Sequence, residues 1–477
     1  MNKLNTPAIP CPVIIGAGPA GINAAITLAE HGINSIVLDE NIAPGGAIFR
    51  QPSKNTRLGH SPVLDKKTRD RANTMLAKLH QYQDKITVYE RTQVLGELGK
   101  NHSIMVLNNN KVAELRYRAL IVCTGCYERS QPFPGWTLPG VMSVGGMQLQ
   151  VKSNLVRPGH RVVLTGTGPL LLVAAKQLHE AGMTVVGVYE AGKKSELYSE
   201  LPALLADIPL LFDGLKYLNY LKKNNIPVYY GWGIVEARGI NEVSKVVVAP
   251  YDKQWRPKRN KHQILDADSL AVNYGFTSRT QLTQQLGCKH SYHHSRGGIK
   301  AEIDEWHHTS RKEIYTAGDA NGIYGSYVAE VEGKIAAYSY LRDNGNIDQT
   351  QAEQVCTPLR NQLKRLLKFQ HGFSQLSTPK EGLLTLPDQE TVICRCEHVT
   401  LEKIDQAIAQ GIVDITKLKM ATRAGMGDCQ GKNCADFCRD YLSQKTQLDH
   451  YEVGKLNPRF PLAPVTFGAF LGEENGA

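Results

Sequence analysis

The chain has 477 residues, of which 42% are hydrophobic and 21% are charged, and its formal net charge is +10. This is the composition of an ordinary globular protein with about three domains of roughly 150 residues each, which excludes disordered, collagen-like and coiled-coil classes. No apolar run approaches the roughly 20 residues of a membrane-spanning helix. The start lacks a continuous apolar segment, so we expect no secretion signal and a cytoplasmic protein.

The excess positive charge is spread along the chain and does not form a recognised nucleic-acid-binding motif. Two basic clusters lie at residues 256–261 and 360–368. We interpret the first as a loop between strands, and the second as an amphipathic helix because Leu363, Leu366 and Leu367 have helical spacing. We therefore expect no nucleic-acid partner, and we assign the excess charge to the binding of an acidic partner protein.

The pattern of strand, glycine-rich turn, helix and strand occurs twice. Residues 11–15 form an apolar run, residues 16–31 combine glycines with an alanine- and leucine-rich helix pattern, and residues 35–38 form a second apolar run. The same succession returns over residues 161–189. Two such units predict an α/β protein with two parallel, doubly wound domains.

The first glycine turn, residues 16–21, has the features that a dinucleotide requires. Gly16 permits a tight turn, Gly18 lets the backbone approach a pyrophosphate, and Gly21 lets helix and strand pack closely. Asp39 ends the second strand, where an acceptor for the ribose 2′-hydroxyl is expected, and Glu40 beside it is an alternative acceptor. The turn therefore predicts a dinucleotide at the helix N-terminus.

Two later segments extend this site. Gly46 and Arg50 follow the ribose acid closely and fit a second wall around a dinucleotide. Gly318 and Asp319 end another strand, before more glycines and a helix from about residue 327. An acid followed by a helix N-terminus can bind ribityl hydroxyls and phosphate, so the combined pattern predicts FAD.

These motifs resemble the two-dinucleotide-binding-domain flavoproteins with the disulfide-reductase-like fold, over roughly residues 10–340. The strand ending at Thr124 and Gly125 is similar to that family's strand ending in A-T-G. The resemblance implies that Asp319 contacts the ribityl and phosphate part of FAD. The C-x-x-C pair at residues 123–126 occupies this strand end, so we do not expect a redox-active dithiol there.

The second glycine turn, residues 166–171, is incomplete. It keeps Gly166 and Gly168, but Leu171 stands where the third glycine would be. Tyr189 is expected at the position of the ribose acid, with Glu190 one residue later. These departures disfavour a nicotinamide dinucleotide. NAD(P), a mononucleotide such as ATP, and no ligand at all stay open for this turn.

Five of the ten cysteines lie between Cys394 and Cys438. Cys394 and Cys396 form a C-x-C pair, and Cys429 and Cys434 form a C-x4-C pair. Four thiolates complete a [2Fe–2S] site, so we predict these four residues as cluster ligands, with structural zinc as the rival. The arrangement resembles the bacterioferritin-associated-ferredoxin-like [2Fe–2S] domain, which is small and helical. Cys438 is interpreted as an off-pattern thiol.

Two pairs of adjacent histidines, at residues 293–294 and 307–308, are similar to metal-binding pairs. Neighbouring residues on a strand point to opposite faces, so neither pair can easily chelate one ion. We therefore interpret all four as surface histidines.

The order of the parts resembles the A or alpha subunit of heteromeric amino-acid and opine dehydrogenases. This family includes octopine and nopaline oxidases, hydrogen cyanide synthase, and dye-linked proline or hydroxyproline dehydrogenases. Residues 127–141 and the G-x-G-P-L-L sequence at 166–171 strengthen the resemblance. It implies that the amine is oxidised on a partner, a D-amino-acid-oxidase-like subunit with its own FAD. FMN at the subunit interface and the [2Fe–2S] cluster would then pass the electrons onward.

From these parts we expect an electron-transfer subunit, and we assign no catalytic residue to it. A small ferredoxin-like subunit and a peripheral membrane acceptor complete the expected partners. The alternative to a purely cytoplasmic location is a peripheral one, at the inner face of the membrane. The alternatives are a self-contained NAD(P)H-dependent flavin–iron–sulfur reductase and a non-catalytic scaffold that binds nucleotide and metal. The expected domains are an FAD-binding domain (1–155 and 255–345), a second dinucleotide-binding-like domain (156–254), a connecting segment (346–390), a [2Fe–2S] domain (391–447) and a tail (448–477).

Overall fold

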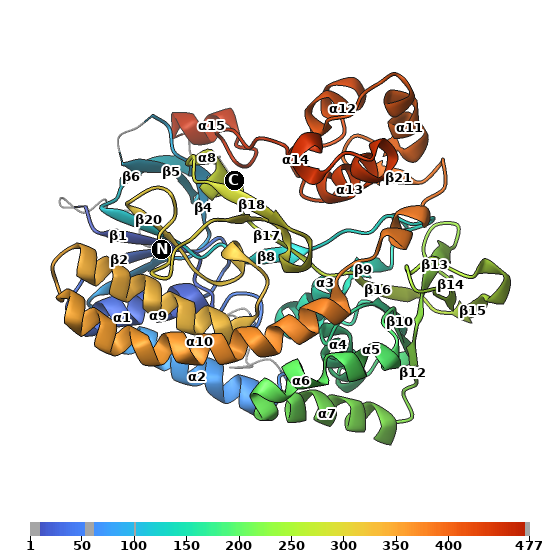
Figure 1. Cartoon of the computed structure of the whole chain (residues 1–477), viewed down its shortest axis with the longest axis horizontal. Helices are drawn as coiled ribbons and strands as arrows, with labels where there is room; N and C mark the ends of the chain where they lie inside the picture. Colours follow the sequence, from blue (N-terminus) through green and yellow to red (C-terminus); the bar gives the residue numbers. More distant parts are fainter. Residues whose placement is uncertain (1–9, 53–61, 100–101, 473–477) are drawn as a thin grey trace. The chain divides into compact units, whose positions relative to one another are not determined.

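The computed structural model describes residues 10–52, 62–99 and 102–472 (Figure 1). The start of the chain, on which the prediction about a secretion signal depends, lies outside the described residues. The chain divides into two compact units. Unit 1 comprises Met1–Tyr127, Thr277–Leu367 and Asn457–Ala477, and unit 2 comprises Glu128–Phe276 and Lys368–Leu456. In the described ranges, no helix has both the length and the apolar character needed to cross a membrane.

Unit 1 is built on a five-stranded parallel sheet in the order β20-β7-β1-β2-β3. All residues of the three central strands β7, β1 and β2 are buried, as expected for a parallel sheet that is covered on both faces. The predicted strands near residues 11–15 and 35–38 are confirmed. The sheet strands are β1 (Pro12–Ile15), β2 (Ser35–Leu38), β3 (Ile86–Tyr89), β7 (Ala119–Val122) and β20 (Ile314–Thr316).

The two faces of this sheet are covered differently. Ile14 and Val37 belong to a core shared with helices α1 (Pro19–Glu30) and α9 (Ser326–Asp343). Their neighbours Val13 and Leu38 point the other way, into a core shared with a three-stranded antiparallel sheet. The remaining elements of unit 1 are α2 (Lys66–Gln81), β4 (Thr92–Gly96), β5 (Ser103–Asn108), β6 (Lys111–Arg116), α8 (Gln281–Gln285), β18 (His290–His293), β19 (Gly298–Ala301) and α15 (Phe467–Leu471).

Unit 2 has a second five-stranded parallel sheet, in the order β12-β11-β10-β16-β9. The predicted second strand–helix–strand pattern is confirmed as β10 (Arg161–Gly166), α4 (Leu170–Glu180) and β11 (Thr184–Glu190). A three-stranded antiparallel sheet follows, and the basic cluster at 256–261 lies between its last two strands, as predicted. The other elements are β9 (Val141–Ser143), α3 (Val144–Leu149), α5 (Lys194–Ser199), α6 (Leu201–Leu204), α7 (Ile208–Lys223), β12 (Val228–Tyr230), β13 (Trp232–Arg238), β14 (Lys245–Pro250), β15 (Gln263–Asp266) and β16 (Ser269–Asn273). Strands β8 (Cys126–Glu128) and β17 (Phe276–Ser278) stand where the chain passes from one unit to the other.

The cysteine-rich part of unit 2 forms a small, mainly helical module with a core of its own. Leu401, Ile404, Leu418 and Phe437 are buried in that core. Before the module, α10 (Gln349–Ser377) is one long helix that contains the predicted amphipathic segment 360–368. The elements of the module are β21 (Val392–Cys394), β22 (Val399–Thr400), α11 (Leu401–Ala409), α12 (Ile415–Thr422), α13 (Ala435–Thr446) and α14 (His450–Val453).

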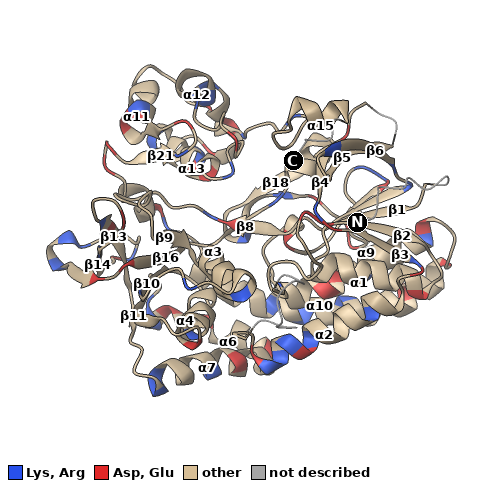
Figure 2. Ribbon diagram, turned by 180° about the vertical axis from the view of Figure 1, so that it is seen from behind, with Lys and Arg blue, Asp and Glu red and all other residues tan. Residues whose placement is uncertain are grey.

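Lysine and arginine are distributed over helices of both units (Figure 2). In unit 1 they recur along α2, and in unit 2 they are found near the end of α7. This distribution agrees with the charge pattern predicted from the sequence.

One histidine pair differs from the expectation of surface residues. His307 is buried, with 3% of its surface exposed, and its Nδ1 contacts the carbonyl oxygen of Thr316 at 3.1 Å. Burial lowers its pKa to about 4. His308 lies between Asp304 and Asp343, whereas His293 and His294 are exposed as expected. The prediction failed at His307 because residues 307–308 lie outside the strands, so the argument from strand geometry did not apply to them.

Two helical glycines provide a matched test of the packing. A Cβ added at Gly333 in α9 would lie 2.1 Å from the carbonyl oxygen of Ala20 in α1. Gly333→Ala should therefore lower the free energy of unfolding by about 1–3 kcal/mol through overpacking. Gly214→Ala, in α7 with nothing within 4 Å of the new Cβ, should instead raise it by about 0.5–1 kcal/mol. Denaturant unfolding followed by circular dichroism measures both, and a shift of the same sign in both variants would contradict the close approach of α1 and α9.

Candidate functional site

Two positions of the first glycine turn can be occupied only by glycine. Gly16 has φ +104°, and a Cβ there would lie 2.3 Å from the carbonyl oxygen of Cys123. A Cβ at Gly21 would lie 1.9 Å from the carbonyl oxygen of Gly16. Helix α1 begins after Gly18 and has no side-chain cap there, the arrangement found where a helix N-terminus binds phosphate.

Asp39 is directed at this turn. Its Oδ2 accepts a hydrogen bond from the backbone N–H of Ala17 at 2.5 Å, and its Oδ1 accepts two from Asn41 at 2.7 Å. Arg50 donates to the side-chain oxygen of Asn41 at 2.6 Å. The structure thus brings Asp39 and Arg50 together through Asn41, a residue that the sequence analysis did not select.

Glu40 is directed to a different partner. Its carboxylate pairs with both terminal nitrogens of Arg279, at 2.5 and 3.1 Å. The backbone N–H of Arg279 donates to Gly125 O at 2.9 Å, and the hydroxyl of Thr124 donates to Arg279 O at 2.7 Å. Arg279 therefore joins three predicted residues, and this geometry favours Asp39 over Glu40 as the acid at the glycine turn. No sequence motif marks Arg279, because its partners lie far away along the chain.

The loop that carries Gly46 lies directly against the turn. Gly46 has φ +61°, and a Cβ there would lie 2.9 Å from Gly18 Cα. The backbone N–H of Gly45 donates to Ala17 O at 2.7 Å. Two backbones are thus in close contact where the pyrophosphate is predicted to bind.

Two carboxyl groups gather at the strand end before α9. Asp319 accepts hydrogen bonds from the backbone N–H groups of Tyr324 and Gly325, and burial raises its pKa. Glu332 in α9 accepts one from the N–H of Gly318 at 2.7 Å. Burial, with the nearby Asp319 charge, raises the pKa of Glu332 to about 8. Glu332 is therefore a neutral acid at pH 7, and no sequence signal marks it beyond a polar residue within a helix.

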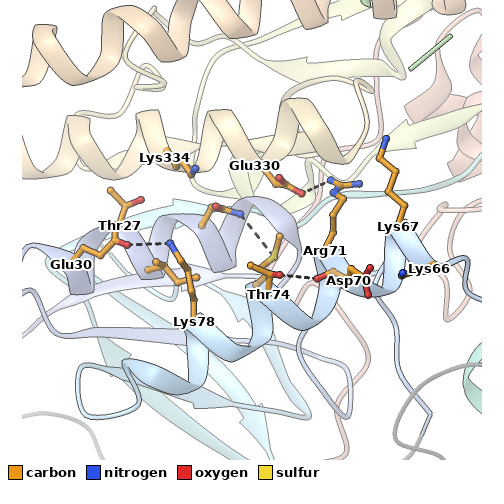
Figure 3. Close-up of a pocket in the computed structure, with 13 residues that line it drawn as sticks. Thr27, Glu30, Lys66, Lys67, Asp70, Arg71, Thr74, Lys78, Glu330 and Lys334 are labelled. Carbon is orange, nitrogen blue, oxygen red and sulfur yellow. Dashed lines mark hydrogen bonds and ion pairs between the residues drawn. The ribbon is translucent and has the colours of Figure 1, made fainter. Parts of the chain in front are cut away.

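The cavity shown in Figure 3 is lined by none of the predicted cofactor residues. It has a volume of about 750 Å³ and lies between α1, α2 and α9. Two ion pairs lie in its wall: Arg71 contacts Glu330 at 2.5 Å and Lys78 contacts Glu30 at 3.7 Å. We interpret it as a solvated groove between helices.

The second glycine turn has its own strand-end acid, which corrects the expected equivalence of Tyr189. Glu190 lies beside Gly166 in the sheet, and it accepts hydrogen bonds from the N–H groups of Gly168 and Gly192, both at 3.0 Å. Asp39 makes the same two kinds of contact at the first turn. A β-bulge in the β10–β11 pairing adds one residue to β11, which displaces the acid by one position. Burial raises the pKa of Glu190 to about 7.

The end of α10 lies over this second turn. A Cβ at Gly168 would lie 3.5 Å from Ser377 Cβ, and a Cβ at Gly192 would lie 3.6 Å from the carbonyl oxygen of Leu376. Lys380 then pairs with Glu196 at 2.6 Å. The chain itself therefore occupies part of the space next to the turn.

The four predicted cysteine ligands meet in pairs. The Cys394 side chain interacts with that of Cys434, and the Cys396 side chain interacts with that of Cys429. Cys434 also interacts with the side chain of Cys438, the thiol that was judged off-pattern. Among the described side chains, no group of three or more His, Cys, Asp or Glu is arranged to hold a metal ion. The structure thus brings the C-x-C and C-x4-C pairs together without forming a closed ligand set.

The backbone around these thiols is shaped by glycine. The N–H of Gly425 donates to the Cys394 sulfur, and Gly425 has φ +87°. A Cβ at Gly427 would lie 2.2 Å from Cys396 Cβ. A cysteine-ligated metal centre is tuned by backbone that packs close to the sulfur atoms and by N–H groups that donate hydrogen bonds to them.

Comparison with known proteins identifies the family. Residues 12–334 match the pyridine nucleotide-disulphide oxidoreductase family, and residues 389–473 match the sarcosine oxidase A3 domain. The chain belongs to the pyridine nucleotide-disulphide oxidoreductase family. It is therefore an α/β protein of an oxidoreductase family, and this membership supports FAD as a cofactor.

Relatives resemble the chain over nearly its whole length. It is 43% identical to hydrogen cyanide synthase subunit HcnB of Pseudomonas aeruginosa, covering 97% of this chain and 99% of that one. It is 30% identical to an opine oxidase subunit of Agrobacterium tumefaciens, covering 95% and 90%. The crystal structure of L-proline dehydrogenase from P. horikoshii has a similar fold, with 22% identity, a TM-score of 0.70, and coverage of 98% of this chain and 80% of that one.

Glu332 predicts a specific pH dependence. Its pKa in the folded protein is about 8, against about 4.3 for an unperturbed Glu. Between these values the unfolded chain releases a proton that the folded chain keeps, so this group makes stability fall as pH rises from 4 to 8. Glu332→Gln should therefore raise the free energy of unfolding at pH 8, on the order of 3 kcal/mol, and change little at pH 4.

Denaturant unfolding at a series of pH values measures this effect. Glu330→Gln is the control, because Glu330 lies on the same helix but pairs with Arg71 near the surface. An equal effect of the Glu332 substitution at both pH values would contradict a neutral buried acid.

Proposed function

We propose that this chain is the flavin and iron–sulfur electron-transfer subunit of a heteromeric amino-acid or opine dehydrogenase. The family supports a flavin-dependent oxidoreductase. Relatives that match it end to end are named as subunits of hydrogen cyanide synthase and of opine oxidase. The observation that carries the iron–sulfur part is the contact of the C-x-C pair with the C-x4-C pair.

In this proposal FAD lies along the first glycine turn of unit 1. Asp39 would hold the ribose, the N-terminus of α1 would hold the pyrophosphate, and Asp319 with the N-terminus of α9 would hold the ribityl chain and phosphate. A bound flavin accepts electrons in pairs and can release them singly. The residues proposed to surround it are Gly16, Gly18, Gly21, Asp39, Glu40, Gly46, Arg50, Thr124, Gly125, Gly318 and Asp319.

The proposed [2Fe–2S] ligands are Cys394, Cys396, Cys429 and Cys434. A cluster carries single electrons, which is the step needed between a flavin and a one-electron acceptor. The match of residues 389–473 to a sarcosine oxidase domain supports a module with its own role. The predicted bounds of that domain are 391–447, and the core of the module continues past them to Val453 of α14. The other expected boundaries stay predictions.

Further cofactors and partners belong to the same proposal. The amine would be oxidised on a D-amino-acid-oxidase-like FAD subunit, with FMN at the interface between the subunits. A small ferredoxin-like subunit, together with a peripheral acceptor at the inner membrane face, would take the electrons. ATP or NAD(P) would be the ligand of the second turn, where Gly166 and Gly168 supply the backbone.

One observation favours a second function, that of a self-contained NAD(P)H-dependent flavin–iron–sulfur reductase. Glu190 supplies the acid that the second turn was expected to lack. Leu171 in place of the third glycine, and Ser377 over the turn, count against it. A non-catalytic scaffold stays the third alternative. It would be indicated by a purified chain that contains zinc but no flavin.

The deciding experiment is anaerobic purification of the full chain, followed by a UV–visible spectrum and by iron, zinc and flavin analysis. We expect flavin bands and about two irons per chain. We also expect that neither NADH nor free amino acids bleach the flavin. Bleaching by NADH would instead establish the reductase, and zinc or a colourless protein would overturn the electron-transfer proposal.

A single substitution separates the ligand role of Gly18 from its structural role. A Cβ at Gly18 would meet only Gly46 Cα, at 3.8 Å, which is an ordinary contact. Gly18→Ala should therefore leave unfolding unchanged while weakening FAD retention about tenfold or more, because the methyl group fills the place where the pyrophosphate approaches. Flavin content after gel filtration measures this, with Gly214→Ala as the control. Full flavin content in Gly18→Ala would count against the proposed FAD position.

A further inference from the structure

The segment Arg129–Trp136, which follows β8, contacts both cysteine-bearing parts of the C-terminal module. All residues of this contact belong to unit 2. At its start, the Arg129 guanidinium pairs with Asp440 of α13, and the two side chains are only 10% and 8% exposed. The hydroxyl of Ser130 donates to Asn433 at 3.4 Å, next to the proposed ligand Cys434. This end of the segment therefore holds the C-x4-C pair.

The other end of the segment holds the C-x-C pair. The indole N–H of Trp136 donates to the carbonyl oxygen of Val392 at 2.6 Å, in the strand β21 that ends at Cys394 (Figure 1). The guanidinium of Arg395 lies 5.3 Å from the centre of the Trp136 ring. Arg395 stands between Cys394 and Cys396 in the sequence. Its cation–π contact with the Trp136 ring therefore holds a positive charge beside the C-x-C pair.

The segment is itself fixed to the core of unit 2. Phe133 is 1% exposed and belongs to that core. The carbonyl oxygen of Pro134 accepts from the N–H of Ala237 at 2.9 Å, and the N–H of Arg129 donates to Gly275 O at 3.0 Å. Because the segment is attached to the core of unit 2 both at Arg129 and at Pro134, its two ends are held at a fixed distance from each other.

The buried pair of Arg129 and Asp440 has further partners that set its geometry. The second oxygen of Asp440 accepts from His450 Nε2 at 3.0 Å, and Arg439 lies 3.6 Å away. Buried ion pairs often add little net stability, but breaking one leaves a costly unpaired charge. Such a pair is better suited to fixing a position than to holding the fold together.

We propose that Arg129 and Trp136 are positioning residues for the iron–sulfur cluster, because one rigid segment fixes both cysteine pairs relative to each other. They would set how firmly the cluster is held, and they would keep the Arg395 charge near it, which favours the reduced cluster and raises its midpoint potential. This inference rests on the proposed function, since it requires that the four cysteines bind the cluster.

The first test compares two Trp→Phe variants of the full chain, purified without oxygen. Trp136→Phe keeps a ring but loses the hydrogen bond to Val392. Trp255→Phe is the control, because Trp255 is 1% exposed in the same core and its indole N–H has no hydrogen-bond partner among the described residues. We expect Trp136→Phe to lose iron to a chelator about tenfold faster than the native chain, with a lower midpoint potential by redox titration followed by electron paramagnetic resonance. Trp255→Phe should match the native chain in both.

The second test uses the ion pair. Arg129→Met and Asp440→Leu should each speed iron loss about tenfold. The double variant should lose iron no faster than the worse single variant, because the two residues act as one unit. Arg129→Lys should recover part of the iron retention. Circular dichroism confirms that each variant is folded, and if Arg129→Met fails to fold, Arg129→Lys and Trp136→Phe decide.

The outcomes separate this inference from the proposed function. A native chain without iron would overturn the proposed function, and with it the role of a cluster. A native chain with a cluster, together with Trp136→Phe and Arg129→Lys variants that keep its potential and its rate of iron loss within twofold, would overturn the positioning role alone.

Discussion

A hydrogen bond from the backbone of a glycine turn to a carboxylate at the end of the next strand organises both units. In unit 1 it joins Ala17 to Asp39, and in unit 2 it joins Gly168 to Glu190. It closes the turn onto the second strand and so fixes the direction of the helix that follows. Phosphate binding at a helix N-terminus depends on that direction, so the proposed cofactor geometry depends on this one contact.

Local patterns predicted the two strand–turn–helix–strand units. Apolar runs beside glycine turns located β1, β2, β10 and β11, because strands buried on both faces of a parallel sheet appear as nearly continuous apolar runs. Counting residues failed where the backbone is irregular: the bulge in β11 moved the strand-end acid from the expected position 189 to Glu190. The register of two paired strands depends on the hydrogen bonds between them, so the spacing of residues along one strand does not reveal a bulge.

The surroundings of the site could not be predicted in the same way. Arg279 pairs with Glu40, which is 239 positions away, and Glu332 owes its neutral form to burial by elements that come together only in the fold. Cys438 contacts Cys434 because both lie at the start of one helix, although ligand spacing alone sets it aside. Sequence motifs show which atoms a ligand needs, whereas the groups that orient those atoms are selected by tertiary contacts.

The division of the chain into interleaved segments has a consequence for its synthesis. Unit 1 takes its residues from the beginning, the middle and the end of the chain, and Leu462 near the end donates a backbone hydrogen bond to Leu95. Unit 2 extends to Leu456. Neither unit can therefore be completed before residue 456 has been synthesised, and apolar strands made early lack some of their partners until then. The early strands of both units therefore expose apolar surface for longer during synthesis than they would if the units followed each other along the chain.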